Sequence, residues 1–317
     1  MPADRQQARA YALLGLVMLL WAGNSIVGRA VRDDVGPFIL SFVRWAGASL
    51  VLAPFAIGAL RRDWEVLRQN WLIVVVLGLT GVAAFNAIMY TGLHYTTATN
   101  GLLLQAAIPP AVLFADRLIF GVRAGWAQIA GILASMLGVA VIVFQGQPSH
   151  VLGFHFGLGD ALVLISCVDW AIYTVLLRKR PKVSPLSFLL ATFLVGVAAI
   201  APLAAWEMLT GPPIRWGAGV GGAFLYVALL PSLVSYLIYN HATGLVGPAR
   251  AGQAITLLPL FGAGLSALLL GEVLHLYHLC GMALIVGGIV LGAVAAREPS
   301  PESSAGASAP ASLEDAP

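Results

Sequence analysis

The sequence predicts an all-α integral membrane protein of ten transmembrane helices, built as two inverted five-helix repeats around a central cavity. Three observations lead to this fold class: the composition, the number of long apolar segments, and an internal repeat. Of the 317 residues, 59% are apolar and 10% are charged, whereas a soluble domain usually carries roughly 25% charged residues. So few charges cannot cover a water-facing surface, and lipid is therefore the expected solvent.

The first half of the chain contains five apolar segments of the length that a spanning helix needs, about 20 residues. The first of them follows Arg5 and Arg9, as the apolar core of a secretory signal would. It is long for a signal, however, and it has a counterpart in the second half, so we interpret it as a spanning helix. The five predicted spans are residues 10–28, 37–58, 70–91, 97–117 and 125–145.

The second half starts after a break at Gln147 and Pro148 and repeats this plan. Its interruptions, at Lys182–Pro185 and Gly211–Pro213, are short and rich in Pro and Gly, so consecutive spans must be antiparallel neighbours. The predicted spans are residues 156–177, 186–206, 217–240, 248–270 and 275–295.

The domain organisation follows from these segments. Residues 1–150 form the first five-helix repeat and residues 151–296 the second, inverted one. Residues 297–317 are rich in Ser, Ala, Pro and acids, which is typical of a disordered segment, and we expect them to be a disordered cytoplasmic tail.

The distribution of Lys and Arg predicts the orientation, because cytoplasmic loops carry an excess of basic residues. With the N-terminus inside, 13 of the 17 basic residues fall on the cytoplasmic side, and Arg29, Arg32 and Arg215 fall outside. Arg44 lies within the second span. A missed helix would scramble this bias, so it supports a multi-pass protein with both termini in the cytoplasm.

The two halves are related by matching residues at nearly one offset. A shift of 150 residues aligns Pro109 with Pro259, and a shift of 149 aligns Trp21 with Trp170 and Tyr90 with Tyr239. The repeat unit is five helices, an odd number, so the second copy must be inserted upside down. Inverted repeats of this kind place a shared site near the membrane midplane and expose it to either side by rocking, which indicates a transporter.

Four short segments are typical of one family of transporters: Leu20-Trp21-Ala22-Gly23-Asn24, Asp169-Trp170-Ala171, Tyr90 to Ala98, and Pro259 followed by Leu269-Leu270-Gly271-Glu272. On these residues the chain resembles the drug/metabolite transporter superfamily, specifically its EamA-type ten-helix exporters of bacteria. The resemblance covers residues 10–296 and implies a multi-pass protein of a bacterial-type inner (plasma) membrane. One difference is that the first half has Val122 where the second has Glu272.

Several predicted spans carry polar and aromatic residues at helical spacing, which gathers them on one face of each helix. Polar residues within a span usually face the bundle interior or a cavity. Small hydroxyl residues such as Ser232 also mediate helix packing, which is the alternative role for them. We also expect Pro109 and Pro259 to kink their helices. The candidate substrate-binding residues are Trp21, Asn24, Asn86, Tyr90, Asp169, Tyr173, Tyr236, Tyr239 and Gln253.

Two charged residues lie within predicted spans. Asp169 is mid-span in the sixth, where a carboxylate costs a few kcal/mol on insertion scales unless it is paired, hydrated or protonated. It is therefore a candidate for coupling transport to protons, or it forms a structural ion pair, with Arg44 as the obvious partner. Arg44 itself has three possible roles: it binds a substrate carboxylate, pairs with an acid, or extends to the interface.

These observations favour one function over three others. Aromatic faces with few charges suit amphipathic zwitterions, so we predict export of amino acids, aromatic ones included, and related metabolites. The alternative is a proton-coupled exporter of aromatic or cationic drugs. A lipid enzyme would need paired acids or a His/Asp cluster, and the acids are scattered. A channel would need rings of repeated polar residues.

The expected partners are a small-molecule substrate and the lipid bilayer. We expect no nucleic-acid partner, no cofactor and no metal, and the sequence leaves both a monomer and a dimer open. It contains no Gly-rich phosphate-binding loop, so a gradient must supply any energy.

Overall fold

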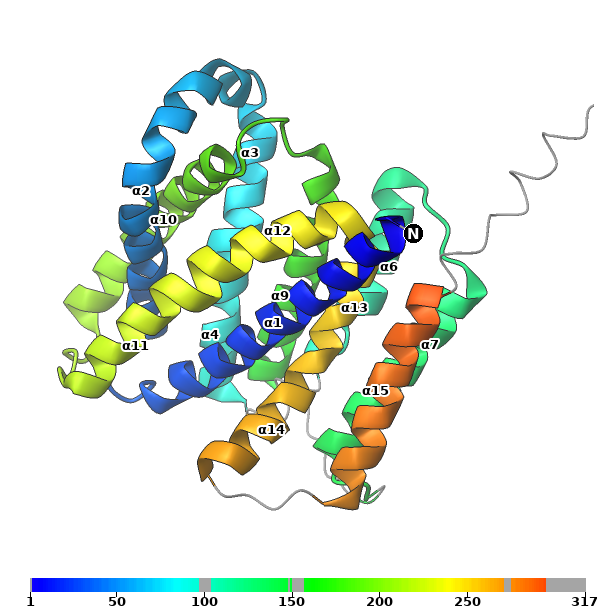
Figure 1. Ribbon diagram of the computed structural model, residues 1–317. Coiled ribbons are helices and arrows are strands. Elements are labelled where there is room, and N and C mark those ends of the chain that lie inside the picture. Colours follow the sequence, from blue (N-terminus) through cyan, green and yellow to red (C-terminus); the bar gives the residue numbers. More distant parts are fainter. Residues whose placement is uncertain (1, 97–103, 148, 150–156, 271–274, 295–317) are drawn as a thin grey trace, which may run out of the picture.

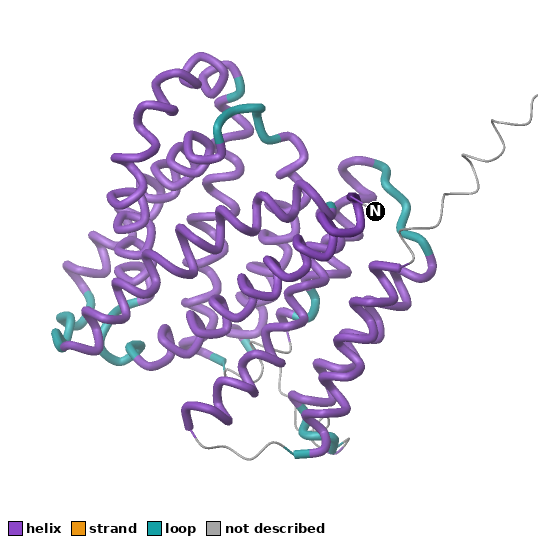
Figure 2. Tube along the Cα trace, in the orientation of Figure 1, coloured by secondary structure: helices purple, strands orange, loops and turns teal. Residues whose placement is uncertain are grey.

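A computed structural model describes residues 2–96, 104–147, 149, 157–270 and 275–294. In these residues the chain forms helices and no strands, as Figure 2 shows. The elements of the first half are α1 (Pro2–Ala30), α2 (Pro37–Gln69), α3 (Trp71–Gly78), the π-helix η1 (Leu79–Ala84), α4 (Phe85–Tyr95), α6 (Ile108–Phe120) and α7 (Trp126–Val143).

The second half has a similar order of elements, with the additional described elements η2, α13 and η4 (Figure 1). It consists of α9 (Leu158–Leu176), the 3-10 helix η2 (Leu177–Lys179), α10 (Pro185–Thr210), α11 (Ala218–Ala228), the π-helix η3 (Leu229–Val234), α12 (Ser235–Val246), α13 (Pro248–Ala254), the 3-10 helix η4 (Ile255–Leu257), α14 (Leu258–Leu270) and α15 (Leu276–Val294). The predicted tail, residues 297–317, lies outside the described residues.

Six helices in the described part of the chain are long and apolar enough to cross a membrane, and α7 and α15 are shorter apolar helices. The predicted spans 97–117 and 248–270 differ from the expectation of continuous helices. A turn at residues 106–107 precedes α6, and η4 separates α13 from α14. The six long helices are Gln6–Gly28, Pro37–Gln69, Trp71–Tyr95, Leu158–Lys179, Pro185–Thr210 and Ala218–Val246.

The irregular turns recur at one spacing in the two halves. The π-helix η1 starts at Leu79 and η3 starts at Leu229, 150 residues later. The turn at residues 106–107 and the 3-10 helix η4 are a second such pair. The helices that follow them, α6 and α14, start at Ile108 and Leu258, again 150 residues apart. The repeat that is faint in the sequence is therefore visible as matching defects in the helices.

Helices α2 and α10 pack along each other and cap each other's ends (Figure 1). Near the end of α10, a carboxylate oxygen of Glu207 accepts a hydrogen bond from the backbone N–H of Ile39 at 2.8 Å, in the first turn of α2. Near the end of α2, Asp63 accepts bonds from the Ser184 N–H at 2.9 Å and the Ser187 hydroxyl at 2.6 Å, where α10 begins. Each carboxylate thus satisfies donors that a helix start leaves without an intrahelical partner.

Helices α7 and α15 form a second close pair, side by side in Figure 1. Their backbones approach so closely that a Cβ atom added at Gly138 would lie 2.6 Å from the Gly281 carbonyl oxygen. The Ser135 hydroxyl donates to the Ile285 carbonyl oxygen at 3.3 Å across the same contact. Small residues that allow such approach are typical of helix pairs in membranes.

Candidate functional site

A cavity lies between helices of both halves, among α1, α2, α4 and α6 from the first and α9, α12, η4 and α14 from the second. Its empty space is about 590 Å³, including the part open to the outside. Most of the lining is apolar or aromatic, with a few polar groups, as is usual for small-molecule sites. The lining residues are Trp21, Asn24, Arg44, Phe85, Asn86, Met89, Tyr90, Leu93, Gln105, Ile108, Trp170, Tyr236, Ile255 and Leu258.

Arg44 is the charged group of this lining, and it is 2% exposed. Its Nη1 atom donates to the Asn86 side-chain oxygen at 3.0 Å and to the Tyr90 hydroxyl at 3.1 Å. The other nitrogens reach η3 in the second half: Nε donates to the Ser232 hydroxyl at 2.5 Å, and Nη2 to the Pro231 carbonyl oxygen at 3.2 Å. A single side chain on α2 therefore joins the two halves at the cavity wall.

The two π-helices accept hydrogen bonds from residues of the opposite half that line the cavity. In each, a backbone N–H bonds to the carbonyl five residues back, from Phe85 to Thr80 and from Ser235 to Leu230. Pro231 has no N–H, and the carbonyl of Val227, four residues earlier, instead accepts a bond from the hydroxyl of Ser232. π-bulges of this kind are frequent at functional sites.

The acceptors are carbonyl oxygens at matching positions, Gly81 and Pro231, which are 150 residues apart. The Gly81 oxygen accepts a hydrogen bond from the Tyr236 hydroxyl of the second half. The Pro231 oxygen accepts one from the Trp21 indole N–H of the first half, at 2.9 Å. The two halves are thus tied together reciprocally, each through the widened turn of the other.

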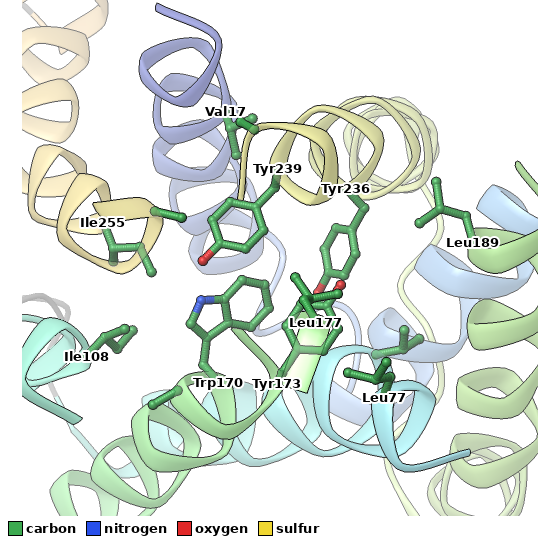
Figure 3. Packing of buried hydrophobic residues seen from close by; sticks show 14 of the residues in the cluster. Val17, Leu77, Ile108, Trp170, Tyr173, Leu177, Leu189, Tyr236, Tyr239 and Ile255 are labelled. Atoms are coloured by element: carbon green, nitrogen blue, oxygen red, sulfur yellow. The ribbon is translucent and has the colours of Figure 1, made fainter. Parts of the chain in front are cut away.

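An aromatic cluster closes one end of the cavity. Figure 3 shows Trp170, Tyr173, Tyr236 and Tyr239 facing one another from α9 and α12, and the ring centres of Trp170 and Tyr173 are 5.1 Å apart. Edge-on and tilted contacts of this kind stabilise aromatic clusters beyond the area that they bury. Trp21 enters the same cluster, with its ring centre 5.1 Å from that of Trp170.

Hydrogen bonds and an ion pair lie beyond this cluster. The Tyr173 hydroxyl donates to the Asn240 side-chain oxygen at 2.7 Å, and Arg180 donates to the Asn240 carbonyl oxygen at 2.7 Å. At the same end of the helices Arg178 bonds to Asp116 at 2.5 Å and joins α6 to the end of α9. The cavity is therefore sealed at the end where α9 and α12 finish.

The structure brings five of the nine candidate substrate-binding residues to the cavity: Trp21, Asn24, Asn86, Tyr90 and Tyr236. The other four lie outside its lining. Tyr173 and Tyr239 belong to the aromatic cluster. The Gln253 side-chain N–H donates to the Gly288 carbonyl oxygen of α15 at 2.9 Å. That Gln253 bond places its side chain against a neighbouring helix rather than in the cavity.

Asp169 also lies outside the cavity lining, and the expected pairing with Arg44 is wrong. Within the described residues, the ion pairs are Arg32–Asp33, Arg68–Glu65 and Arg178–Asp116, so Arg44 is held by neutral groups instead. The Oδ2 atom of Asp169 is buried and has no hydrogen-bond partner there. The sixth helix turns its neighbour Trp170 toward the cavity, which leaves Asp169 on a different face.

The two prolines expected to kink their helices lie where helices restart. Pro109 is the second residue of α6, after the turn at residues 106–107, and Pro259 is the second residue of α14, after η4. Proline fits the first turn of a helix because its missing N–H has no intrahelical acceptor there. Each break thus comes before the proline.

Sequence reasoning missed several members of the site. Phe85, Met89 and Gln105 line the cavity, and Asp116 and Arg178 form the ion pair beyond the seal. Met89 and Phe85 precede Tyr90 by one and five residues and could be taken for lipid-facing residues. Pro231 lies within a predicted span, and a proline there could have indicated the irregular turn η3. Among the described residues, no three His, Cys, Asp or Glu side chains are placed to hold a metal ion.

Comparison with known proteins gives one family. The model of the EamA-like transporter family matches the chain twice, over residues 8–144 and 157–293. "Uncharacterized transporter YyaM" of Bacillus subtilis is 27% identical over 237 residues, covering 74% of this chain and 76% of that protein. An "Uncharacterized transporter" of Archaeoglobus fulgidus is 28% identical over 288 residues, covering 90% and 97%.

A solved crystal structure has the same fold. It superposes with a TM-score of 0.70 at 20% sequence identity, covering 92% of this chain and 98% of that one. The two family matches fall one in each predicted repeat, and the predicted resemblance to this family is confirmed.

Proposed function

The chain belongs to the EamA-like transporter family, and we propose that it exports amino acids, aromatic ones included, and related small metabolites by alternating access. The two relatives from Bacillus subtilis and Archaeoglobus fulgidus are both named transporters. The observation that carries the proposal is the cavity, because both halves of the chain line it and its walls are aromatic with a few hydrogen-bonding groups.

The proposed membrane arrangement has ten spans, with α6 and the broken α13–α14 segment contributing the fourth and ninth. Broken helices near the midplane are a recurring feature of secondary transporters built from inverted repeats. The bias of Lys and Arg supports an orientation in the inner membrane with both termini in the cytoplasm.

In this orientation the cavity lies toward the outer side. Asn24 and Arg44 belong to the outer thirds of α1 and α2, and Tyr90 to the outer third of the continuous helix Trp71–Tyr95. Tyr173 and Arg178 lie toward the cytoplasmic end of the continuous helix Leu158–Lys179, and Asn240 toward that of Ala218–Val246. The aromatic cluster and the Arg178–Asp116 pair then act as an inner gate. Export requires the opposite state, in which this gate opens and the outer end closes.

The paired π-helices offer a place for that movement. The π-helix η1 bonds to the other half through the Gly81 carbonyl oxygen, and η3 does so through the Pro231 carbonyl oxygen and the Ser232 hydroxyl. Breaking these few bonds lets the halves tilt against each other without unfolding a helix. A gradient of substrate or of protons supplies the energy.

Transport by the pure protein in liposomes tests the proposal. A labelled panel of amino acids, nucleosides and quaternary cations is offered with and without a pH gradient, and protein-free liposomes are the control. We expect uptake of aromatic and large apolar amino acids above the control. Absence of uptake of the whole panel under both conditions would contradict the proposed function.

A further inference from the structure

We propose that Arg44 is the carboxylate-binding residue of the cavity, and that the substrates are amphipathic carboxylates with an aromatic or branched apolar body. This inference deepens the proposed function and rests on it. It assigns a substrate class and the residue that selects it.

The charge of Arg44 supports this assignment. A guanidinium within a membrane span costs roughly 2.5–3.5 kcal/mol on insertion scales, so its charge is normally offset. Arg44 is 2% exposed, yet in the described part of the chain its acceptors are side-chain oxygens of Asn24, Asn86, Tyr90 and Ser232 and a backbone carbonyl, all neutral. The cavity therefore holds one positive charge with no carboxylate among its lining residues.

The hydrogen-bond geometry of the guanidinium also supports it. A guanidinium carries five N–H donors, of which two belong to Nη2. Nη2 makes one hydrogen bond within the described residues, to the Pro231 carbonyl oxygen. The Nε and Nη1 donors are held by Ser232, Asn86 and Tyr90, which fix the plane of the group. One donor of a positioned cation thus remains for a ligand, and bonds of this kind to a carboxylate are among the strongest in proteins.

The rest of the lining suits the apolar body of such a substrate. Phe85, Met89, Leu93 and Trp170 present apolar and aromatic surface beside Arg44. An amino group on the ligand would meet neutral oxygens, such as those of Asn24 and Gln105, rather than a carboxylate. An amphipathic acid or zwitterion therefore fits, whereas a cation without a carboxylate is repelled by the guanidinium and finds no acid among the described lining residues.

Matched probes test this inference. Phenylalanine, 3-phenylpropionate and phenethylamine share an aromatic body and differ in whether they carry a carboxylate, an amine or both. Binding to the detergent-purified protein is measured by calorimetry, and transport by counterflow in liposomes. For the wild-type chain we expect phenylalanine and 3-phenylpropionate to bind at least about tenfold more tightly than phenethylamine.

Two variants at Arg44 and one matched control identify the residue. We expect Arg44→Gln to bind the two carboxylates about tenfold or more weakly than the wild type, so that their affinities come closer to that of phenethylamine. Arg44→Lys should keep part of the affinity for the carboxylates. The control is Arg32→Gln, an exposed arginine at the same end of the helices, which should bind like the wild type. Thermal melting confirms that each variant is folded.

The outcomes separate the two proposals. Tight binding of phenethylamine but not of the carboxylates by the wild-type chain overturns the role of Arg44 and leaves a transporter of cations. Unchanged carboxylate affinity in folded Arg44→Gln also overturns it. If Arg44→Gln does not fold, the role of Arg44 is tested by the order of the wild-type affinities for the three probes and by the carboxylate affinity of Arg44→Lys. Failure of the wild-type chain to move any solute contradicts the proposed function itself.

Discussion

The hydroxyl of Tyr236, in the second half, donates a hydrogen bond to the carbonyl oxygen of Gly81, in the first. Gly81 lies in the π-helix η1, and the residue at its matching position, Pro231 of η3, receives the same kind of bond from Trp21. The widened turns are therefore two of the points at which the repeats are joined, and the donors of both bonds line the cavity.

Tyr236→Phe removes the hydroxyl and keeps the ring, which is in contact with Trp21, Trp45 and Trp170. We expect the free energy of unfolding to fall by about 0.5–1 kcal/mol, the usual size of one such bond between membrane helices. We also expect faster exchange between the outward and inward states, because one tie between the repeats is lost. Thermal melting and initial counterflow rates measure the two effects.

The control for this prediction is Tyr95→Phe, since Tyr95 is 66% exposed. It should melt and transport like the wild-type protein. Wild-type melting together with wild-type counterflow in Tyr236→Phe would show that the bond to Gly81 does not hold the repeats together.

Removing the reciprocal caps of α2 and α10 should destabilise the protein additively. We expect Asp63→Ala and Glu207→Ala each to lower the free energy of unfolding by about 0.5–2 kcal/mol, as the loss of a helix cap does. The two carboxylates lie at opposite ends of the helix pair, so the double variant should show the sum of both losses.

Chemical denaturation of the single and double variants measures these losses. Glu65→Ala, in an exposed ion pair with Arg68, is the control and should change stability by less than about 0.5 kcal/mol. Losses no larger than that control would mean that the two carboxylates do not act as caps.

The close approach of α7 and α15 predicts a difference between two adjacent glycines. A Cβ atom at Gly288 would collide with the Gly131 carbonyl oxygen and the Ser135 hydroxyl, whereas a Cβ at Gly287 meets nothing within 4 Å. We expect Gly288→Ala to cost about 1–3 kcal/mol through overpacking. Gly287→Ala should be neutral or stabilising by up to about 1 kcal/mol, because alanine favours the helix.

Melting temperatures of the two variants in one detergent check this prediction. The two substitutions are chemically the same and differ by one position, so a general effect of alanine would shift both alike. Equal melting temperatures would disprove the close contact of the two helices.

Asp169→Asn tests proton coupling. The carboxylate lies outside the cavity lining, and its Oδ2 atom is buried with no partner among the described residues, so we expect the variant to fold and to bind substrate normally. We expect uptake driven by a pH gradient to disappear while counterflow, which needs no proton, continues.

The matched control is Asp33→Asn, in an exposed position near the end of α1, which should respond to the pH gradient like the wild type. Full pH-driven uptake in folded Asp169→Asn would leave this carboxylate without a coupling role.

Much of the fold could be predicted because lipid imposes simple demands on a sequence. Long apolar segments must form helices, since no water is present to pair with the backbone. Trp21, Asn24, Asn86, Tyr90 and Tyr236 could be placed at the cavity because polar and aromatic residues avoid lipid when they have an interior to face. Tyr173, Tyr239 and Gln253 have the same character, and only packing decided that they face neighbouring helices instead.

By itself, the sequence determined that the chain is a helical membrane protein with two related halves, because composition and the order of matching residues are properties of the chain alone. The tertiary structure decided what lies beside what. It showed that Arg44 is held by neutral groups from both halves rather than by Asp169. It also showed that each π-helix accepts a hydrogen bond from a side chain of the opposite half. Such contacts join residues far apart in the chain, by 188 positions between Arg44 and Ser232 and by 210 between Trp21 and Pro231, and helical spacing within a segment carries no information about them.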